Sequence, residues 1–402
     1  MNVLVINAGS SSCKYQLINM ENEVVLCAGL VERIGEDMGK LAHKIAPDTD
    51  KEEKIVLEQP FANHVEGMKK VVELITDADK GVVKDKSEIG AIGHRVVMGG
   101  EEITKSVKVD AKVKEIIDGY KALCPLHNPA NLAGIEVAEE LFPGTPSVAV
   151  FDTEFHQTMP SRAYMYPLPL NLYEDLKVRR YGFHGTSHRY VTKKAAEFLG
   201  KPVDEVNLVT CHLGNGCSMA AVKNGKCIDT TMGITPLEGL MMGTRCGDID
   251  PAIVPFLVEA KGMTAAEVDT LMNKQSGLKG ICGMNDMRDI HAAVEKGDEK
   301  AKMALDMFVY RIKKYIGSFY AALGRVDAVI FTAGIGENDD IVRAEVCSEM
   351  EVLGITIDLE KNAVRSGEPR NIAKAEGSVA VLVVPTNEEL EIAQATMEVL
   401  KG

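Results

Sequence analysis

The chain has 402 residues, more than a single hydrophobic core usually accommodates, so its length predicts two domains. A net charge of −14 without any basic run argues against nucleic acid or an anionic membrane surface as partner, and no apolar stretch is long enough to span a bilayer. The nine cysteines include no C-x-x-C pair, which disfavours a zinc site or a disulfide framework and indicates a cytoplasmic protein.

Strand and helix patterns alternate along the chain, which is typical of an α/β protein. Apolar runs at 3–6, 13–18 and 23–28, separated by polar turns, predict an N-terminal antiparallel ribbon. Apolar residues at helical spacing from Phe61 to Ile75 predict the helix that follows. Further strands are predicted near 89–93, 147–151, 206–211, 217–223, 327–332 and 379–384.

Two segments in the second half of the chain predict helices. Residues 287–323 are expected to form one long helix or two abutting helices. In the last segment, Thr386 is followed three residues later by Glu389, which matches a capping box and predicts that the final helix begins there.

Glycine-rich loops follow several of the predicted strands. The first, NAGSSSCKYQL at 7–17, fits neither of the common phosphate-binding patterns, G-x-x-x-x-G-K-[ST] and G-x-G-x-x-G. Aligned without a gap on HLGNGCSMAAVKNG, it places Gly9 on Gly214 and Leu17 on Val222. Because the offset is about half the chain, we favour a duplicated domain over a chance match of two hairpins.

A third loop of this kind, TAGIGEN, carries Gly334 and Gly336. Glycine would let a ligand approach the backbone, and the start of the following helix would favour negative charge, although many strand-to-helix turns use glycine for geometry alone. Together the three loops predict phosphate groups held from both sides of an interdomain cleft.

Nine sequence blocks, in this order, are specific enough to indicate a family. They are VLVINAGSSSCKYQL, GHRVVMGGE, PLHNPAN, FDTEFHQTMP, YGFHGTSHRYV, HLGNGCS, DTTMGITPLEGLMMGTRCGDIDP, TAGIGEN and PTNEELEIA. Over essentially the whole length the chain resembles the acetate kinases. The resemblance implies a reversible, Mg²⁺-dependent conversion of acetate and ATP into acetyl phosphate and ADP, by direct in-line transfer in a homodimer.

The same resemblance implies an α/β fold of two duplicated ribonuclease-H-like domains, similar to sugar kinases, Hsp70 and actin, with nucleotide in the interdomain cleft. Residues 1–150, joined by the C-terminal helix 387–402, are expected to form the N-terminal domain, and residues 151–386 the nucleotide-binding domain. Two alternatives stay open. One is a propionate or butyrate kinase of the same family, and the other, from a different class, is an Hsp70- or actin-like ATPase.

The chemistry explains why arginines are of interest in an acidic chain. Acetate is already ionised at neutral pH, so the obstacle is the approach of a carboxylate to an anionic phosphate, not the removal of a proton. Arg95 and Arg245 stand near glycines, where a guanidinium could hold a carboxylate or phosphate through two hydrogen bonds, although the ordinary role of an arginine is solvated surface charge. By the resemblance, both position acetate and stabilise the phosphoryl group in flight, and His184 adds a hydrogen-bond donor. Asp152, at a strand end, is expected to orient Arg95, Arg245 or a Mg²⁺-bound water instead of acting as a base.

Metal ligands are expected at the two ends of the chain. Glu388, in the first turn of the last helix, could simply complement the helix dipole, but the resemblance makes it a Mg²⁺ ligand with Asn7 nearby, and Mn²⁺ is expected to substitute. His127 and His212 carry weaker versions of the role given to His184, whereas His188 is expected to be structural.

The remaining site residues rest on the resemblance alone. The apolar pocket for the acetate methyl group is expected to comprise Val97, Leu126, Phe183 and Pro236. Nucleotide contacts are expected from Ser12, Lys14, His212, Asn215, Gly216, Asp286, Met287, Arg288, Gly334, Ile335, Gly336 and Asn338, with Lys14 making only a secondary contact. Glu154 stands where the family usually has alanine, which leaves the electrostatics beside the site open.

Overall fold

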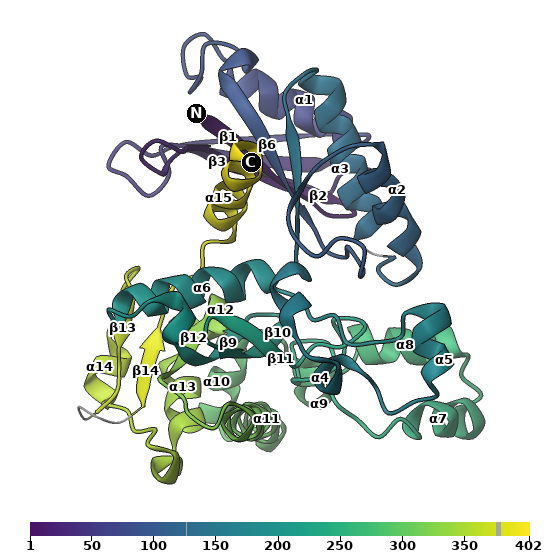
Figure 1. The fold of residues 1–402 in the computed structure, drawn as a ribbon, viewed down its shortest axis with the longest axis vertical. Coiled ribbons are helices and arrows are strands. Elements are labelled where there is room, and N and C mark those ends of the chain that lie inside the picture. Colours follow the sequence, from purple (N-terminus) through teal and green to yellow (C-terminus); the bar gives the residue numbers. More distant parts are fainter. Residues whose placement is uncertain (126, 375–378) are drawn as a thin grey trace. The chain divides into compact units, whose positions relative to one another are not determined.

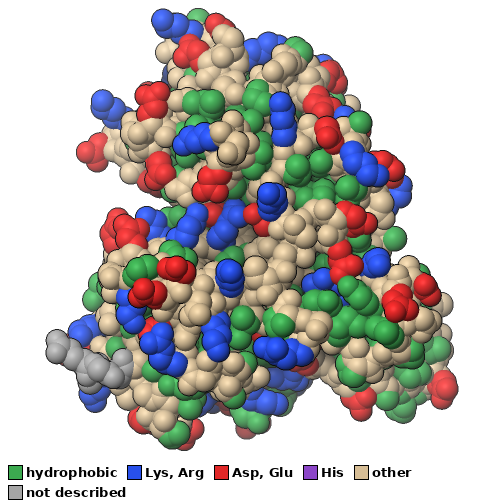
Figure 2. Space-filling view, viewed as in Figure 1, with side chains coloured by type: hydrophobic (Ala, Val, Ile, Leu, Met, Phe, Trp, Pro, Cys, Tyr) green, Lys and Arg blue, Asp and Glu red, His purple; other side chains and the backbone are tan. Residues whose placement is uncertain are grey.

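The computed structural model describes residues 1–125, 127–374 and 379–402. The chain forms two compact units: unit 1 comprises Met1–Glu154 and Asn387–Gly402, and unit 2 comprises Phe155–Thr386 (Figure 1). Leu126, expected beside the acetate methyl group, lies outside the described residues. None of the described helices has both the length and the apolar composition needed to cross a bilayer. On the face shown in Figure 2, acidic and basic side chains are interspersed over both units.

Unit 1 is built on an eight-stranded mixed sheet in the order β5-β4-β3-β2-β1-β6-β8-β7. Strands β1 to β5 form an antiparallel meander, which contains the predicted ribbon, and β6 and β8 continue from β1 in parallel. The strands span Asn2–Ala8 (β1), Ser12–Asn19 (β2), Val24–Glu32 (β3), Gly39–Ile45 (β4), Glu53–Gln59 (β5), Ile89–Val96 (β6), Val107–Lys108 (β7) and Ser147–Phe151 (β8).

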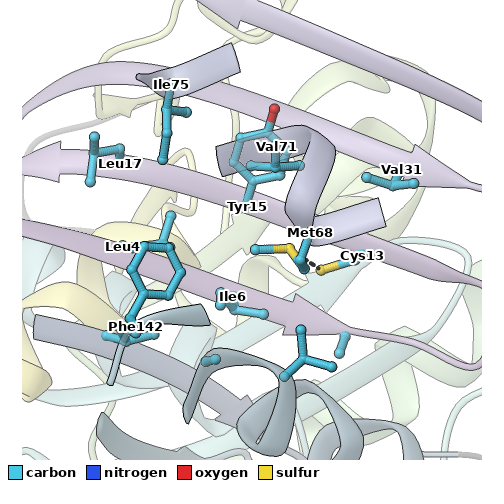
Figure 3. Packing of buried hydrophobic residues seen from close by; sticks show 14 of the residues in the cluster. Leu4, Ile6, Cys13, Tyr15, Leu17, Val31, Met68, Val71, Ile75 and Phe142 are labelled. Carbon is cyan, nitrogen blue, oxygen red and sulfur yellow. Dashed lines mark hydrogen bonds between the residues drawn. The ribbon is translucent and has the colours of Figure 1, made fainter. Parts of the chain in front are cut away.

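Helices cover both faces of this sheet, because successive strand residues point to opposite sides. On one face, a buried cluster that includes Leu4 packs with α1 (His64–Ile75) and α3 (Asn128–Leu141) (Figure 3). On the other face, a cluster that includes Val3 packs with α15 (Glu388–Lys401). The C-terminal helix therefore completes the core of unit 1, although all of unit 2 separates it in sequence from the rest of that core.

Unit 2 repeats this framework on a six-stranded sheet in the order β11-β10-β9-β12-β14-β13. Its hairpin β9–β10 corresponds to β1–β2, and β12 and β14 add in parallel as β6 and β8 do. This shared strand order and direction confirms the predicted duplication. The strands span Asn207–Leu213 (β9), Cys217–Lys223 (β10), Lys226–Thr230 (β11), Ala328–Thr332 (β12), Arg370–Asn371 (β13) and Ala380–Val383 (β14).

The two hairpins differ by one residue in their turns. Ala8 pairs with Cys13 across the first turn, whereas Leu213 pairs with Cys217 across the second. The ungapped alignment therefore holds through the first strand and is wrong beyond the turn, where a shift of one residue exchanges the two faces of a strand. In the structural match, Asn7 and Lys14, which lie opposite each other in unit 1, correspond to His212 and Ser218 in unit 2.

The long C-terminal helical segment is two helices, α10 (Met287–Glu295) and α11 (Glu299–Leu323), separated at Gly297, which has a positive φ. Helices α6 and α11 pack against the β9–β10 hairpin, and Figure 1 shows them on opposite faces of the sheet. The other helices are α2 (Ala111–Gly119), α4 (Ser161–Tyr164), α5 (Leu170–Leu176), α6 (Gly185–Phe198), α7 (Ile253–Lys261), α8 (Ala265–Lys274), α9 (Gly277–Cys282), α12 (Ala333–Asn338), α13 (Asp340–Cys347) and α14 (Leu359–Ala363). Short 3₁₀ turns span Lys86–Glu88, Tyr120–Ala122, Glu154–Thr158, Val203–Glu205 and Glu351–Leu353.

The predicted capping box of the last helix is wrong. Asn387, not Thr386, caps α15, and its side chain accepts the backbone N–H of Leu390. The Thr386 N–H is instead donated to the carboxylate of Glu337 in unit 2. The pattern misleads because a residue outside the segment, far away in sequence, satisfies this donor.

Candidate functional site

Three polar side chains end three neighbouring parallel strands of unit 1. Asn7 lies near the end of β1, Arg95 near the end of β6, and Asp152 directly after β8. On each strand the residues two or four positions earlier belong to the cluster packed against α15 or contact that helix. Since strand side chains alternate between faces, all three polar groups lie on the α15 face at the carboxyl edge of the sheet.

Arg95 and Asp152 form a bidentate ion pair. The distances are 2.9 Å from Nε to Oδ1 and 2.7 Å from Nη2 to Oδ2. The Asp152 side chain is only 2% exposed and that of Arg95 21%. Burial lowers the pKa of the Arg95 guanidinium, but the nearby carboxylates, Asp152 above all, raise it by more. Arg95 therefore remains a cation whose plane is fixed by Asp152.

The first turn of α15 adds two carboxylates to this edge. Glu389 forms an ion pair with Nζ of Lys14, which lies opposite Asn7 in the hairpin. Within the described residues Glu388 forms no ion pair, and burial raises the pKa of its carboxyl although Arg95 acts in the opposite direction. A half-buried carboxylate without an ion-pair partner, on the same edge as an amide side chain, fits a hydrated divalent cation, which needs few protein ligands.

Two asparagines of α3 hold the loop that follows β6. The side-chain oxygen of Asn131 accepts the N–H of Val97 at 3.0 Å, and its amide donates to the Ala8 carbonyl at 2.8 Å. Asn128 exchanges two hydrogen bonds with the backbone of Met98. The sequence analysis missed both residues; their spacing in PLHNPAN, three apart at a helix start, is the signal that could have identified them.

Local contacts also position two residues left open by the sequence. Glu154 accepts the hydroxyl hydrogen bond of Ser106 at 2.6 Å. Nδ1 of His127 lies 3.7 Å from the sulfur of Cys124, just before α3. Glu154 and His127 both belong to unit 1, as does Asp152.

In unit 2, His184 and Arg245 approach a single point. His184 precedes α6 with a φ of 57°, a left-handed conformation that costs a non-glycine residue free energy. Its ring stacks on His212 with centroids 4.2 Å apart. A Cβ atom at Gly216 would lie 3.5 Å from Cε1 of His184 and 3.6 Å from Nη1 of Arg245, so the absence of a side chain there keeps this point open.

Buried hydroxyl groups hold the histidine rings. The Ser218 Oγ lies 2.9 Å from Nδ1 of His184 and 2.7 Å from Nε2 of His188. On its other side, Nδ1 of His188 lies 2.7 Å from Oγ1 of Thr210. Burial, followed by the neighbouring histidines, lowers the pKa of His188 well below its ordinary value, so this ring is neutral.

The loop that carries Arg245 is braced by a second arginine. Nη1 of Arg245 donates to the carbonyl of Pro236 at 3.2 Å. Arg180 pairs with Glu238 in the same loop at 2.5 Å and donates to the Thr230 carbonyl at 2.6 Å. These bonds fix the backbone from which Arg245 projects.

A cavity of about 800 Å³ lies within unit 2. It is lined by several of the residues expected to bind nucleotide, namely Asn215, Asp286, Met287, Arg288, Gly334, Ile335 and Asn338. The sequence analysis missed the other lining residues, Gly214, Asn285, His291, Asp339, Asp340, Ile341 and Arg365.

Two carboxylates at the cavity are paired with basic side chains. Asp286 caps α10, and the side-chain hydrogen bond from Arg288 lowers its pKa to about 2. Asp286 therefore both begins a helix and lies at the cavity wall. His291 bonds Asp339 at 2.7 Å, and this hydrogen bond raises the pKa of the imidazole.

The turn after β12 differs from the predicted open helix start. The carboxylate of Glu337 accepts the N–H of Ala333 at 2.8 Å, so the protein itself fills part of the expected anion position. The opposite end of α12 is held by Arg343, which is fully buried and donates to the carbonyls of Gly336 and Glu337 at 2.9 Å. Burial lowers the pKa of Arg343 to about 10.

Several predicted residues lie outside the cavity wall. Ser12 and Lys14 belong to unit 1, whereas His212, Gly216 and Gly336 belong to unit 2 without lining the cavity. Phe183 is buried, and its carbonyl accepts a hydrogen bond from His156 at 2.9 Å. In the described part of the chain, no three His, Cys, Asp or Glu side chains converge to ligate a metal ion.

Known proteins resemble the chain over its whole length. Residues 2–394 match the model of the acetokinase family. The acetate kinase of Oleidesulfovibrio alaskensis is 84% identical over 402 residues, the full length of both chains. The solved acetate kinase of Porphyromonas gingivalis superimposes with a TM-score of 0.94 at 46% identity, covering 99% of each chain. A solved propionate kinase from Francisella tularensis gives a TM-score of 0.92 at 42% identity, also covering 99% of each chain.

Proposed function

The chain belongs to the acetokinase family, and we propose that it catalyses the reversible transfer of the γ-phosphoryl group of ATP to acetate, giving acetyl phosphate and ADP. The observation that carries this proposal is the bidentate Arg95–Asp152 pair at the carboxyl edge of the unit 1 sheet. A guanidinium held in a fixed plane can present its remaining N–H groups to a carboxylate or phosphate.

The reaction requires charge neutralisation but no general base. One oxygen of the ionised acetate attacks the γ-phosphorus, the bond from phosphorus to the β,γ-bridging oxygen breaks, and ADP leaves with that electron pair. Both oxygens of Asp152 are already engaged by Arg95, which supports an orienting role for this carboxylate. Arg245 and His184 are the proposed donors to the phosphoryl group, since both approach the open point beside Gly216.

We assign Glu388, through bridging waters, and Asn7 to a Mg²⁺ ion that accompanies the nucleotide. The ion would neutralise phosphate charge, and Mn²⁺, which accepts the same oxygen ligands, is expected to substitute. The carboxylate excess at this edge supports the assignment, because the two cations Arg95 and Lys14 are paired with Asp152 and Glu389.

The cavity of unit 2 is the proposed nucleotide site. It combines backbone at Gly334 and Ile335 with polar side chains at Asn215 and Asn338, which suits a ribose and phosphates. Five further residues remain predicted nucleotide contacts outside this wall, namely Ser12, Lys14, His212, Gly216 and Gly336. Binding of the nucleotide between the two units also remains a prediction.

A propionate kinase is the second candidate, favoured by the likeness to the Francisella tularensis enzyme. Val97, Phe183 and Pro236 are the described members of the predicted methyl pocket. An apolar pocket discriminates against one methylene by only about 1–3 kcal/mol. Propionate is therefore expected to be a poorer substrate than acetate, and kcat/KM values for the C2, C3 and C4 acids decide between the candidates.

Two further assignments complete the proposal. All nine cysteines are free thiols, which supports a reducing, cytoplasmic location.

The large apolar side chains of Ile253 and Phe256 on α7 are exposed, which supports a homodimer that covers them with a second copy of the chain. Sedimentation of wild type and Phe256→Ser tests this, and an unchanged dimer in the variant would exclude α7 from the interface.

Trapping of acyl phosphate by hydroxylamine tests the function. With ATP, Mg²⁺ and acetate, the enzyme should form acetyl hydroxamate at a rate that matches the release of ADP. ADP release without any hydroxamate would favour an Hsp70- or actin-like ATPase and overturn the assignment.

A further inference from the structure

A line of hydrogen bonds leads from the interior of unit 2 to His184. The Thr210 hydroxyl on β9 donates to the backbone carbonyl of Ala220 on β10 at 3.4 Å. The same hydroxyl lies 2.7 Å from Nδ1 of His188. A hydroxyl has one hydrogen to give, so both contacts are hydrogen bonds only if Thr210 donates to the carbonyl and accepts from His188, and we infer this direction.

This first step fixes every step that follows. His188 carries its hydrogen on Nδ1 and, being neutral and fully buried, leaves Nε2 as a bare acceptor. Nε2 of His188 therefore accepts the hydroxyl hydrogen of Ser218, at 2.7 Å. With its hydrogen committed, the Ser218 oxygen accepts from Nδ1 of His184 at 2.9 Å.

From this geometry we propose that Thr210, His188 and Ser218 are positioning residues that fix the tautomer of His184. The proposal deepens the proposed function, because His184 is the donor assigned there to the phosphoryl group. Neutral His184 has its hydrogen on Nδ1 and turns a lone pair at Nε2 toward the open point beside Gly216. Only the doubly protonated ring can then donate to an anionic phosphoryl oxygen from Nε2.

Several titratable groups face His184. His212 on β9 stacks on its ring, Arg245 approaches the same point from its loop, and His188 on α6 contacts it through Ser218. His156 packs edge-on against His188. Of the four, Arg245 is a fixed cation, and His188 keeps the neutral state on which the tautomer depends.

The backbone of His184 agrees with a ring held for function. A histidine with a φ of 57° is strained, and such strain persists only where surrounding bonds over-determine the position. The ring bond to Ser218 and the stack on His212 are such constraints. Nδ1 is thereby held by Ser218, while Nε2 faces the open point beside Gly216.

Replacement of Thr210 provides a test at a residue that His188 and Ser218 separate from His184. Thr210→Val removes the hydroxyl at nearly constant volume. His188 can then carry its hydrogen on Nε2, Ser218 can donate to Nδ1 of His184, and neutral His184 can donate from Nε2. In wild type, log kcat should fall as pH rises through the titration of His184. In Thr210→Val this alkaline fall should flatten, so that the ratio of variant to wild-type kcat rises with pH.

Thr210→Ser is the matched control, since it keeps the hydroxyl and should keep the wild-type pH profile. Profiles of equal shape for the Val and wild-type enzymes would overturn the proposal. A purely structural role for Thr210 would lower kcat equally at every pH and is excluded by a change of shape.

A spectroscopic test does not depend on the activity. In ligand-free enzyme labelled with ¹⁵N-histidine, the signal assigned through His184→Asn should show a protonated Nδ1 and a bare Nε2 above the titration of the ring. The Thr210→Val enzyme should show the opposite tautomer gaining population. A protonated Nε2 in neutral wild-type His184 would overturn the inference even if hydroxamate forms, whereas failure to form hydroxamate would overturn only the proposed function.

Discussion

The two halves of the chain place different chemistry on the same framework. In unit 1 the hairpin positions Asn7 and Lys14 belong to a charged edge that includes the Arg95–Asp152 pair. In unit 2 the corresponding positions are His212 and Ser218, in a cluster of imidazoles and hydroxyls. Shared strand order thus fixes where functional groups lie, while the residue types decide whether ions or neutral donors act there.

The difference has an energetic consequence. Removing one partner of a buried ion pair typically lowers the free energy of unfolding by about 3–5 kcal/mol, because the remaining charge is left without compensation. A neutral hydrogen-bond chain costs less to interrupt, about 0.5–1.5 kcal/mol for each bond, but its state depends on proton positions. We therefore expect large, charge-dependent effects of substitution at the Arg95–Asp152 pair and pH-dependent effects along the line from Thr210 to His184.

The largest effect is expected when the Arg95–Asp152 ion pair, the clamp of unit 1, is broken. Asp152→Asn leaves Arg95 without its charged partner, so kcat/KM for acetate should fall about 10²–10³-fold, comparable to the loss of a preorganised donor. Steady-state kinetics with acetate varied measure this. Glu154→Gln, a change two residues away in a carboxylate bonded to Ser106, should stay within a few-fold of wild type. If both variants behave alike, the clamp is not what orients acetate.

Asp152→Asn also tests the absence of a general base. An orienting carboxylate leaves no acidic limb in the kcat profile, because acetate needs no deprotonation. An acidic limb in wild type that disappears in Asp152→Asn would show that Asp152 is a base.

A second prediction concerns the hydrogen bonds of a buried arginine in unit 2. Arg343→Lys keeps the charge but cannot reproduce the bonds to Asn362, Gly336 and Glu337. The free energy of unfolding should fall by about 3 kcal/mol, because hydrogen bonds of a buried charged group are lost. KM for ATP should rise, since α12 lines the cavity. Arg288→Lys is the exposed control, expected within about 0.5 kcal/mol. Equal melting temperatures for the two variants would contradict the bracing role.

A third prediction concerns acid stability in unit 1. Burial lowers the pKa of His94 to about 3, whereas the unfolded chain binds its proton near pH 6.5. The contribution of neutral His94 to stability is therefore complete above about pH 6.5 and is lost as pH falls toward about 3. Between about pH 6.5 and 5, the free energy of unfolding should fall by about 2 kcal/mol less in His94→Gln than in wild type. Denaturant unfolding at several pH values measures this free energy. Parallel plots of it against pH for the two proteins would contradict the prediction.

The smallest effect is expected at the proposed metal ligand. Glu388→Ala should raise the Mg²⁺ concentration needed for half-maximal activity about tenfold, a typical cost of disturbing a metal's surroundings. The KM for acetate should change much less. Metal titrations at saturating substrates provide the measurement, and equal changes in both constants would count against a metal role.

The sequence predicted the framework because strand patterns and strand ends are local features. Asp152 is expected from its place at a strand end and Arg95 from its neighbouring glycines together with the family resemblance, and the structure brings them into one ion pair. The capping of α15 by Asn387, the Glu337 carboxylate at the start of α12 and the one-residue difference in the turns could not be read locally. Each depends on residues that meet only after the chain folds.

The hydrogen-bond line to His184 shows the same limit more clearly. His188 is four residues after His184 on the chain, and sequence alone gives no reason to join them through Ser218. The register of the β9–β10 hairpin places Thr210 opposite Ala220 and thereby sets the direction of the whole line. The pairing of strands in the folded chain therefore decides which ring nitrogen of neutral His184 carries the hydrogen.

The central claim is that the Arg95–Asp152 pair of unit 1 orients acetate, while the cavity of unit 2 binds the nucleotide. Calorimetric titration of Mg·ADP into the Arg95→Ala enzyme tests this claim most directly. The account predicts a dissociation constant within about twofold of wild type, although hydroxamate formation from acetate falls about 10²–10³-fold. Nucleotide binding weakened tenfold or more in the same variant would contradict the division of roles between the two units.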